Sequence, residues 1–173
     1  MSADHFDRLG LPRRFAVDAA ALERAYLARS RAVHPDYHLA GPSADLSASL
    51  ELSAALNEAY NTLRDPFARA EHLLALEGGP SATEQKDVSP AFLVEVMDLR
   101  ERLEAAGDNA AETDRLANDF TARYEALLDT VGDLFHRIET ADVPDRANLL
   151  KQVRATLNAA KYVRGLIRDL NSD

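Results

Sequence analysis

Hydrophobic residues recur at helical spacing along almost the whole chain, and we find neither the alternation typical of a strand nor an internal repeat. The pattern predicts a short helix over 4–9 that ends at Gly10, and a longer helix that begins after Asp18 as its N-cap. A third helix is predicted over about 45–63. A short fourth helix starts at Pro66 and turns three apolar residues inward: Ala70, Leu73 and Leu74. The first part of the chain therefore predicts two long helices flanked by two short ones.

The second part of the chain predicts three more helices. Ser89 and Pro90 are a favourable N-cap and first helical residue for a helix that ends at Gly107. A long helix follows over about 111–140, and a last helix runs from a break at Val143-Pro144 to about residue 170. Three helices joined by short connections predict an antiparallel bundle, so we expect an all-α protein.

The segment Gly78-Gly79-Pro80-Ser81 is the strongest candidate for a domain boundary, because Gly and Pro cluster there and the polar segment after it has no helical stripe. We therefore expect a first domain over 1–76, a linker over 77–88 and a second domain over 89–173.

Composition narrows the possible functions. The chain has 173 residues and no cysteine, which excludes disulfides, thiolate metal ligands and cysteine nucleophiles. The net charge is -9, and the chain shows no cluster of basic residues of the kind that nucleic-acid-binding proteins carry. No apolar run is long enough for a membrane span, and the first residues lack the basic and apolar regions of a signal peptide. We expect a soluble, cytoplasmic protein that binds neither nucleic acid nor membrane.

The tripeptide His34-Pro35-Asp36 lies between the two longest helices predicted in the first domain. Proline lacks the backbone donor and disfavours helical geometry in the residue before it, so the incoming helix must end there and the tripeptide lies at the tip of a helical hairpin. One alternative is a simple helix-ending turn that Asp36 caps. Another is a zinc site from His34, Asp36 and His38, against which the proline in a hairpin loop argues.

Three further segments carry a family resemblance: 56–66 (LNEAYNTLRDP), 69–74 (RAEHLL) and 92–101 (FLVEVMDLRE). With His34-Pro35-Asp36, the first of them resembles a J-domain, a helical hairpin with this tripeptide in its central loop. Over nearly its full length the chain is similar to the HscB family, the J-domain co-chaperones of iron–sulfur cluster assembly. The resemblance implies an N-terminal J-domain hairpin followed by a three-helix bundle that binds a client protein.

In that family the tripeptide triggers ATP hydrolysis in a heat-shock-seventy chaperone of the HscA/DnaK type, and a basic face on the second helix meets the chaperone's acidic surface. The resemblance places this face at Arg24 and Arg31. Three departures from the family pattern bear on this role. Tyr37 follows the tripeptide where relatives have Lys or Arg, and Arg29 stands where they have a large apolar residue. The basic face is also thin, with only Arg24 and Arg31 on one side of the helix.

The helix after Ser89 carries more apolar surface than a bundle needs. Phe92, Val96, Leu99 and Leu103 form a sufficient core stripe. Leu93 and Met97 form a second stripe, which is either ordinary core or a binding surface; the residues alone leave both open. The resemblance implies that an IscU-type scaffold protein docks in this region, with these residues: Leu93, Val94, Met97, Asp98, Glu101 and Tyr162. For Tyr162 the alternative is a half-buried structural tyrosine.

The leading hypothesis is a co-chaperone, not an enzyme, that stimulates the chaperone ATPase and delivers the scaffold; the alternative is a J-domain adaptor for a different client. A helical hydrolase using His34 and Asp36 lacks a nucleophile, a metal cluster and a phosphate-binding loop.

We expect no cofactor, and no direct binding of an iron–sulfur cluster, because the chain has no cysteine. Exposed apolar residues near Met97 are compatible with a monomer or a weak homodimer. Three histidines look scattered and without convergent partners: His5, His72 and His136.

Overall fold

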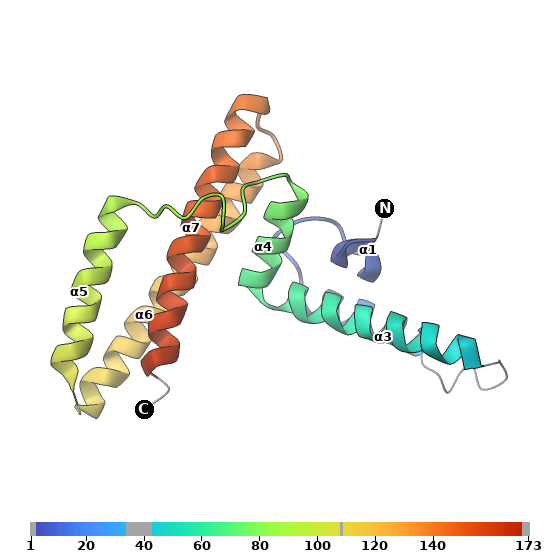
Figure 1. The fold of residues 1–173 in the computed structure, drawn as a ribbon, viewed down its shortest axis with the longest axis horizontal. Helices are drawn as coiled ribbons and strands as arrows, with labels where there is room; N and C mark the ends of the chain where they lie inside the picture. The colour runs from blue at the N-terminus through green and yellow to red at the C-terminus, as the bar shows by residue number, and fades with distance from the viewer. Residues whose placement is uncertain (1–2, 34–42, 108, 171–173) are drawn as a thin grey trace. The chain divides into compact units, whose positions relative to one another are not determined.

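The computed structural model describes residues 3–33, 43–107 and 109–170 (Figure 1). Every regular element in these ranges is an α-helix, which confirms the all-α prediction. The chain divides into two compact units, Met1–Leu73 and Leu74–Asp173. The elements are α1 (His5–Leu9), α2 (Ala19–Val33), α3 (Ser43–Arg64), α4 (Pro66–Leu76), α5 (Pro90–Ala106), α6 (Ala110–Ile138) and α7 (Val143–Leu170).

Helix α1 is capped at both ends: Gly10 ends it as the sequence predicts, and Asp4, which the sequence pattern predicts as its first residue, is its N-cap. The Asp4 carboxylate accepts hydrogen bonds from the backbone N–H groups of Phe6 (2.8 Å) and Asp7 (3.0 Å). Gly10 ends the helix in the left-handed region at φ 66°, which glycine adopts without steric cost. Phe6 and Leu9 are fully buried, so this short helix is an anchor of the first core.

Helices α2 and α3 form the predicted hairpin. The rings of Tyr26 and Tyr60 stack at a centroid distance of 4.4 Å, and the Tyr26 hydroxyl donates to Asn57 Oδ1 at 2.7 Å. Near the other end of the hairpin, the Ser49 hydroxyl donates to the Val33 carbonyl. Because Tyr26 pairs with the late part of α3 and Val33 with its early part, the two helices run antiparallel.

Helix α4 begins where the sequence predicts. The Asp65 carboxylate caps it by accepting from the Phe67 N–H at 2.8 Å. All three residues predicted to face inward are buried: Ala70, Leu73 and Leu74. Arg69 packs its guanidinium over the Phe15 ring at 5.1 Å and donates to the Leu63 carbonyl at 2.7 Å. Burial lowers the pKa of Arg69, and these contacts retain the guanidinium inside the first unit.

The second unit is a bundle of α5, α6 and α7 (Figure 1). Helices α6 and α7 run antiparallel along each other and supply most of the core. The sequence predicts the break at Val143-Pro144, and α7 begins at Val143 so that Pro144 lies in its first turn, where proline is tolerated. The buried residues of this pair include Leu116, Phe120, Val131, Leu134, Val153, Leu157 and Val163.

Residues 77–87, within the segment predicted as a linker, lie along α7. Arg154 is only 3% exposed and donates from Nε to the Pro80 carbonyl at 2.9 Å. Gln85 donates to the Lys151 carbonyl at 3.0 Å, and Asn158 donates to the carbonyls of Gln85 at 2.9 Å and Asp87 at 3.1 Å. These side chains satisfy backbone carbonyls of a segment without regular structure, and they fix it to the bundle just before α5 begins.

None of the helices in the described ranges combines the length and apolar composition needed to cross a bilayer.

Candidate functional site

The exposed face of α5 is the clearest candidate for a binding surface. Of the predicted core stripe, Phe92, Val96 and Leu99 are buried, whereas Leu103 is half-buried. The neighbouring residues of the second apolar stripe are not buried: Leu93 is 51% exposed and Met97 is 64% exposed. The second apolar stripe is therefore not ordinary core, and the interpretation of these residues as core is wrong.

Leu93, Val94 and Met97 together form what we term the α5 patch. Val94 is 69% exposed, the most open of the three. Helical geometry, at 3.6 residues per turn, places Glu101 one turn after Met97 and Asp98 one turn after Val94, so both border the patch, and both are exposed. The patch is thus apolar with an acidic border.

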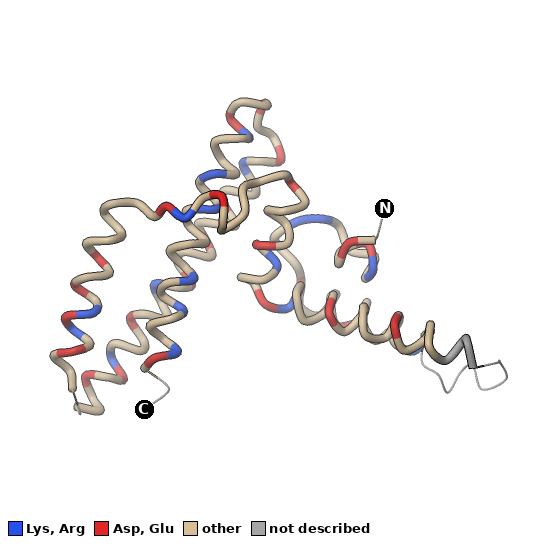
Figure 2. Tube along the Cα trace, in the orientation of Figure 1, with Lys and Arg blue, Asp and Glu red and all other residues tan. Residues whose placement is uncertain are grey.

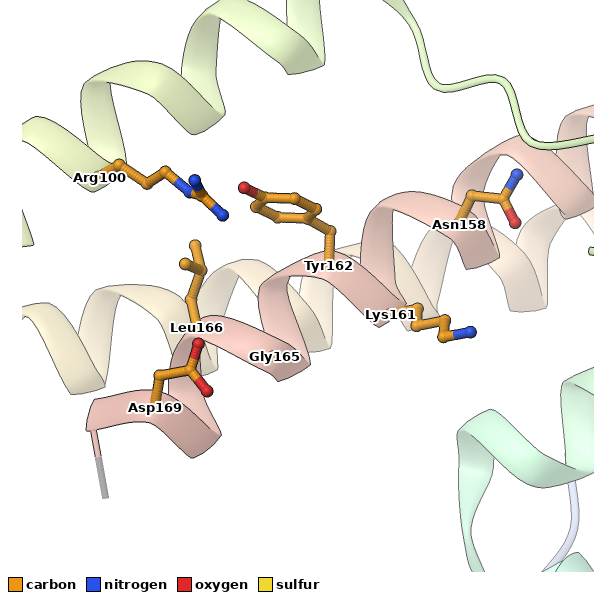
Figure 3. Close-up of a pocket in the computed structure, with 7 residues that line it drawn as sticks. All are labelled: Arg100, Asn158, Lys161, Tyr162, Gly165, Leu166 and Asp169. Carbon is orange, nitrogen blue, oxygen red and sulfur yellow. The ribbon is translucent and has the colours of Figure 1, made fainter. Parts of the chain in front are cut away.

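Tyr162 on α7 is half-buried and contacts two residues of α5, Phe92 and Arg100. Its ring meets the Phe92 ring edge-on, at 6.2 Å between centroids and 87° between planes. The guanidinium of Arg100 on α5 lies 5.4 Å from the centre of the Tyr162 ring, and Figure 3 shows the two side chains pointing toward one another. Tyr162 is therefore held structurally by α5 while part of its ring stays open to solvent.

An open groove runs between α5 and α7 at this point, with a volume of about 320 Å³. Its lining residues are Arg100, Asn158, Lys161, Tyr162, Gly165, Leu166 and Asp169 (Figure 3). Of these, the sequence singles out only Tyr162. An interior glycine in a predicted helix was a signal for the groove, because it leaves a gap on the helix surface.

Ion pairs tie α5 to α6 on the side away from this groove. Arg102 Nη2 lies 2.9 Å from Asp119 Oδ2, and Arg123 Nε lies 2.6 Å from Glu95 Oε1. The pairing with Asp119 raises the pKa of Arg102. Basic and acidic residues are interspersed along α5, α6 and α7 (Figure 2). These exposed pairs orient α5 more than they stabilise it.

In the first unit, the predicted basic face is present on α2. Arg24 and Arg31 are both exposed and lie seven residues apart, hence on one side of the helix. Leu27, between them in the chain and on the same side, is 43% exposed. Arg24 approaches Asp18 only at 4.0 Å. We term these three residues, Arg24, Leu27 and Arg31, the α2 face; it consists of two cationic side chains on either side of an exposed apolar one.

The tripeptide His34-Pro35-Asp36 and the neighbouring Tyr37 lie outside the described residues, between the last residue of α2, Val33, and the first of α3, Ser43. Arg29, the other departure from the family pattern, is exposed, and its guanidinium lies against Gly10 at the end of α1. A side chain at Gly10 would collide with it as well as strain the backbone.

Two of the three histidines predicted to be scattered, His5 and His72, lie in contact, so the prediction is wrong for this pair. The rings of His5 and His72 lie 4.2 Å apart, with Phe6 stacked 5.9 Å from His72. The His5 N–H points to His72 Nε2 at 3.4 Å, which requires that nitrogen to be unprotonated. Because 67 residues separate the two histidines, only the packing of α1 near α4 could reveal the pair.

We expect the attachment of α1 to weaken below about pH 6.5. Burial, and then the neighbouring His5, lower the pKa of His72 below its ordinary 6.5. The unfolded chain therefore takes up this proton at a higher pH than the folded chain, so stability is present above 6.5 and is lost as the pH falls through the lowered pKa. Amide hydrogen exchange over α1, corrected for intrinsic rates and followed from about pH 8 to about pH 5, measures the loss.

His72→Gln is the control, since glutamine retains an acceptor and does not titrate. Protection of α1 in this variant should not change over the same pH range. Asp4 does not interfere: burial raises its pKa, but the N–H groups of Asp7 and Phe6 and the charge of Arg13 lower it below 3.8 overall. Constant protection in the unmodified protein would contradict the prediction.

No three side chains of histidine, aspartate or glutamate converge as a metal site in the part of the chain that the structure describes.

Comparisons with known proteins agree on one family. Residues 88–171 match the family model described as the HSCB C-terminal oligomerisation domain. A co-chaperone protein HscB homolog of Bordetella petrii is 41% identical over 137 residues, which are 77% of this chain and 81% of the relative. Chaperone HscB from Vibrio cholerae has a TM-score of 0.74 at 27% identity, covering 97% of this chain and 95% of the other. Human co-chaperone protein HscB has a TM-score of 0.81 at 25% identity, covering 97% and 80%.

Proposed function

Since the chain belongs to the HscB family of co-chaperones, we propose that it stimulates the ATPase of a heat-shock-seventy chaperone of the HscA/DnaK type and delivers to it an IscU-type scaffold protein for iron–sulfur cluster assembly. We assign the chaperone contact to residues 1–76 and the scaffold contact to residues 89–173, with 77–88 between them.

The α5 patch is the observation that carries the scaffold assignment. Three large apolar side chains, Leu93, Val94 and Met97, are exposed within two turns of one helix, although the bundle already has a complete core stripe on that helix. Grouped apolar exposure of this kind marks a protein-binding surface. The acidic flank of Asp98 and Glu101 supplies the polar rim that such surfaces carry.

The α2 face supports the chaperone assignment. Arg24 and Arg31 are free to meet an acidic surface, and Leu27 adds an apolar contact between them. Two exposed cations speed the encounter more than they tighten the complex. The tripeptide His34-Pro35-Asp36 follows directly after this helix and would act on the chaperone's conformation, without taking part in phosphate chemistry.

Delivery follows from having both binding surfaces on one chain. A scaffold held by the second unit is present near the chaperone at an effective concentration set by the connection, which reaches about the millimolar range for short links. This makes the co-chaperone an adaptor as well as an activator.

Steady-state ATP hydrolysis by the cognate chaperone tests the proposal. We expect stimulation when this protein is added alone, and greater stimulation when the scaffold is added with it than the two separate effects predict. If this protein stimulates the ATPase but the scaffold does not enhance that stimulation, the protein activates the chaperone without delivering the scaffold. No stimulation at all would contradict the J-domain assignment and leave an adaptor role.

A further inference from the structure

Gly165 has no structural reason to be glycine. It lies inside α7, a helix of 28 residues, where glycine costs about 1 kcal/mol relative to alanine. Its φ is not positive, since the positive-φ glycines among the described residues are Gly10, Gly78 and Gly107. A Cβ built at Gly165 would meet no atom within 4 Å, whereas one at Gly79 would collide with Leu74. Neither the backbone nor a neighbouring helix therefore requires a glycine at position 165.

The missing side chain instead forms the floor of the groove between α5 and α7. Tyr162 and Leu166 are its apolar walls, and Figure 3 shows Arg100 reaching across from α5. The volume of about 320 Å³ is at the low end of the range of about 300 to about 1,000 Å³ for small-molecule sites, and it has room for one large side chain.

The charges at the groove point to the chemistry of its occupant. Arg100 and Lys161 have no carboxylate within ion-pair distance among the described residues, although the chain as a whole carries a net charge of -9. Asp169 at the far edge pairs with Arg168. The Arg100 guanidinium lies 5.4 Å from the centre of the Tyr162 ring, and its N–H groups can still bind a carboxylate through two hydrogen bonds.

We propose that the groove over Gly165 is a specificity pocket that takes one bulky apolar side chain of the scaffold, next to an acidic residue of the scaffold that pairs with Arg100. The inference rests on the proposed function and deepens it. The α5 patch then supplies a broad apolar contact, while the groove fixes the register of the partner. An apolar segment with acidic groups at the Arg100 side and basic groups at the Asp98 and Glu101 side fits this surface in one direction only.

Scaffold binding by two variants of one position tests the pocket. Gly165→Leu fills the groove, and we expect it to weaken scaffold binding by about ten-fold or more, measured by calorimetry. Gly165→Ala adds one methyl group, and we expect binding within about three-fold of the unmodified protein. Because both residues favour helix over glycine, the melting temperature of each variant should stay the same or rise, so lost binding cannot be ascribed to unfolding.

Arg100→Gln gives an independent readout. It should weaken scaffold binding and reduce the dependence of binding on salt, because one exposed ion pair is removed. The pocket would be overturned if Gly165→Leu and Arg100→Gln both bind the scaffold normally while the double variant Leu93→Ala, Met97→Ala does not. The proposed function would still stand in that case. An unmodified protein that does not bind the scaffold would overturn both.

Discussion

Replacing Leu93 and Met97 together with alanine is expected to weaken scaffold binding by about 100-fold, while stimulation of the chaperone by the variant alone stays unchanged. Apolar residues at the centre of an interface commonly cost between about 1 and about 2 kcal/mol each when truncated, and a sum of about 2.7 kcal/mol for the pair corresponds to 100-fold. Leu93 and Met97 are 51% and 64% exposed, so most of the area lost on truncation is area that a partner would cover. Titration calorimetry with the scaffold measures the change.

The structure offers a matched control for this variant. Val143 is 82% exposed in the same unit, at the start of α7, and its replacement by alanine also removes exposed apolar area. Val143→Ala should bind the scaffold like the unmodified protein. Both variants should unfold within about 0.5 kcal/mol of it, as surface substitutions usually do. Equal loss of binding in Val143→Ala would mean that the scaffold does not recognise the α5 patch in particular.

Replacing His34 with glutamine is expected to return ATP hydrolysis by the chaperone to its basal rate at every concentration of the variant. Glutamine retains a hydrogen-bonding side chain but lacks the imidazole through which, under the proposed function, the tripeptide would act on the chaperone. The substitution lies far in sequence from the α5 patch, so scaffold binding should be unchanged. A coupled ATPase assay and the same calorimetric titration separate the two activities.

His38→Gln is the control, because it makes the same substitution in the same segment outside the tripeptide. It should stimulate the chaperone like the unmodified protein. If both histidine variants lose stimulation, the segment acts through its general structure and not through His34. If His34→Gln also loses the scaffold, the variant has lost its fold, which the helical signal in circular dichroism would reveal.

Local rules explain why so much of the fold follows from the sequence. Asp4 with Gly10, and Ser89 with Pro90, act through bonds that span a few residues, so the ends of α1 and the start of α5 need no tertiary information. Helical periodicity likewise places Phe92, Val96 and Leu99 on one face, and the structure buries them together. The motif at residues 34–36 and the similarity of residues 92–101 identify the family before any coordinates.

The sequence by itself thus determined the helices, their caps, the core stripes and the family. Only the tertiary structure decided whether the face of a helix next to its core stripe packs against another helix or stays exposed. Periodicity states that Leu93 and Met97 share a face, but only the placement of α6 and α7 leaves that face open. The pairing of His5 with His72 and the groove over Gly165 depend on contacts between elements far apart in the chain, which no local pattern encodes.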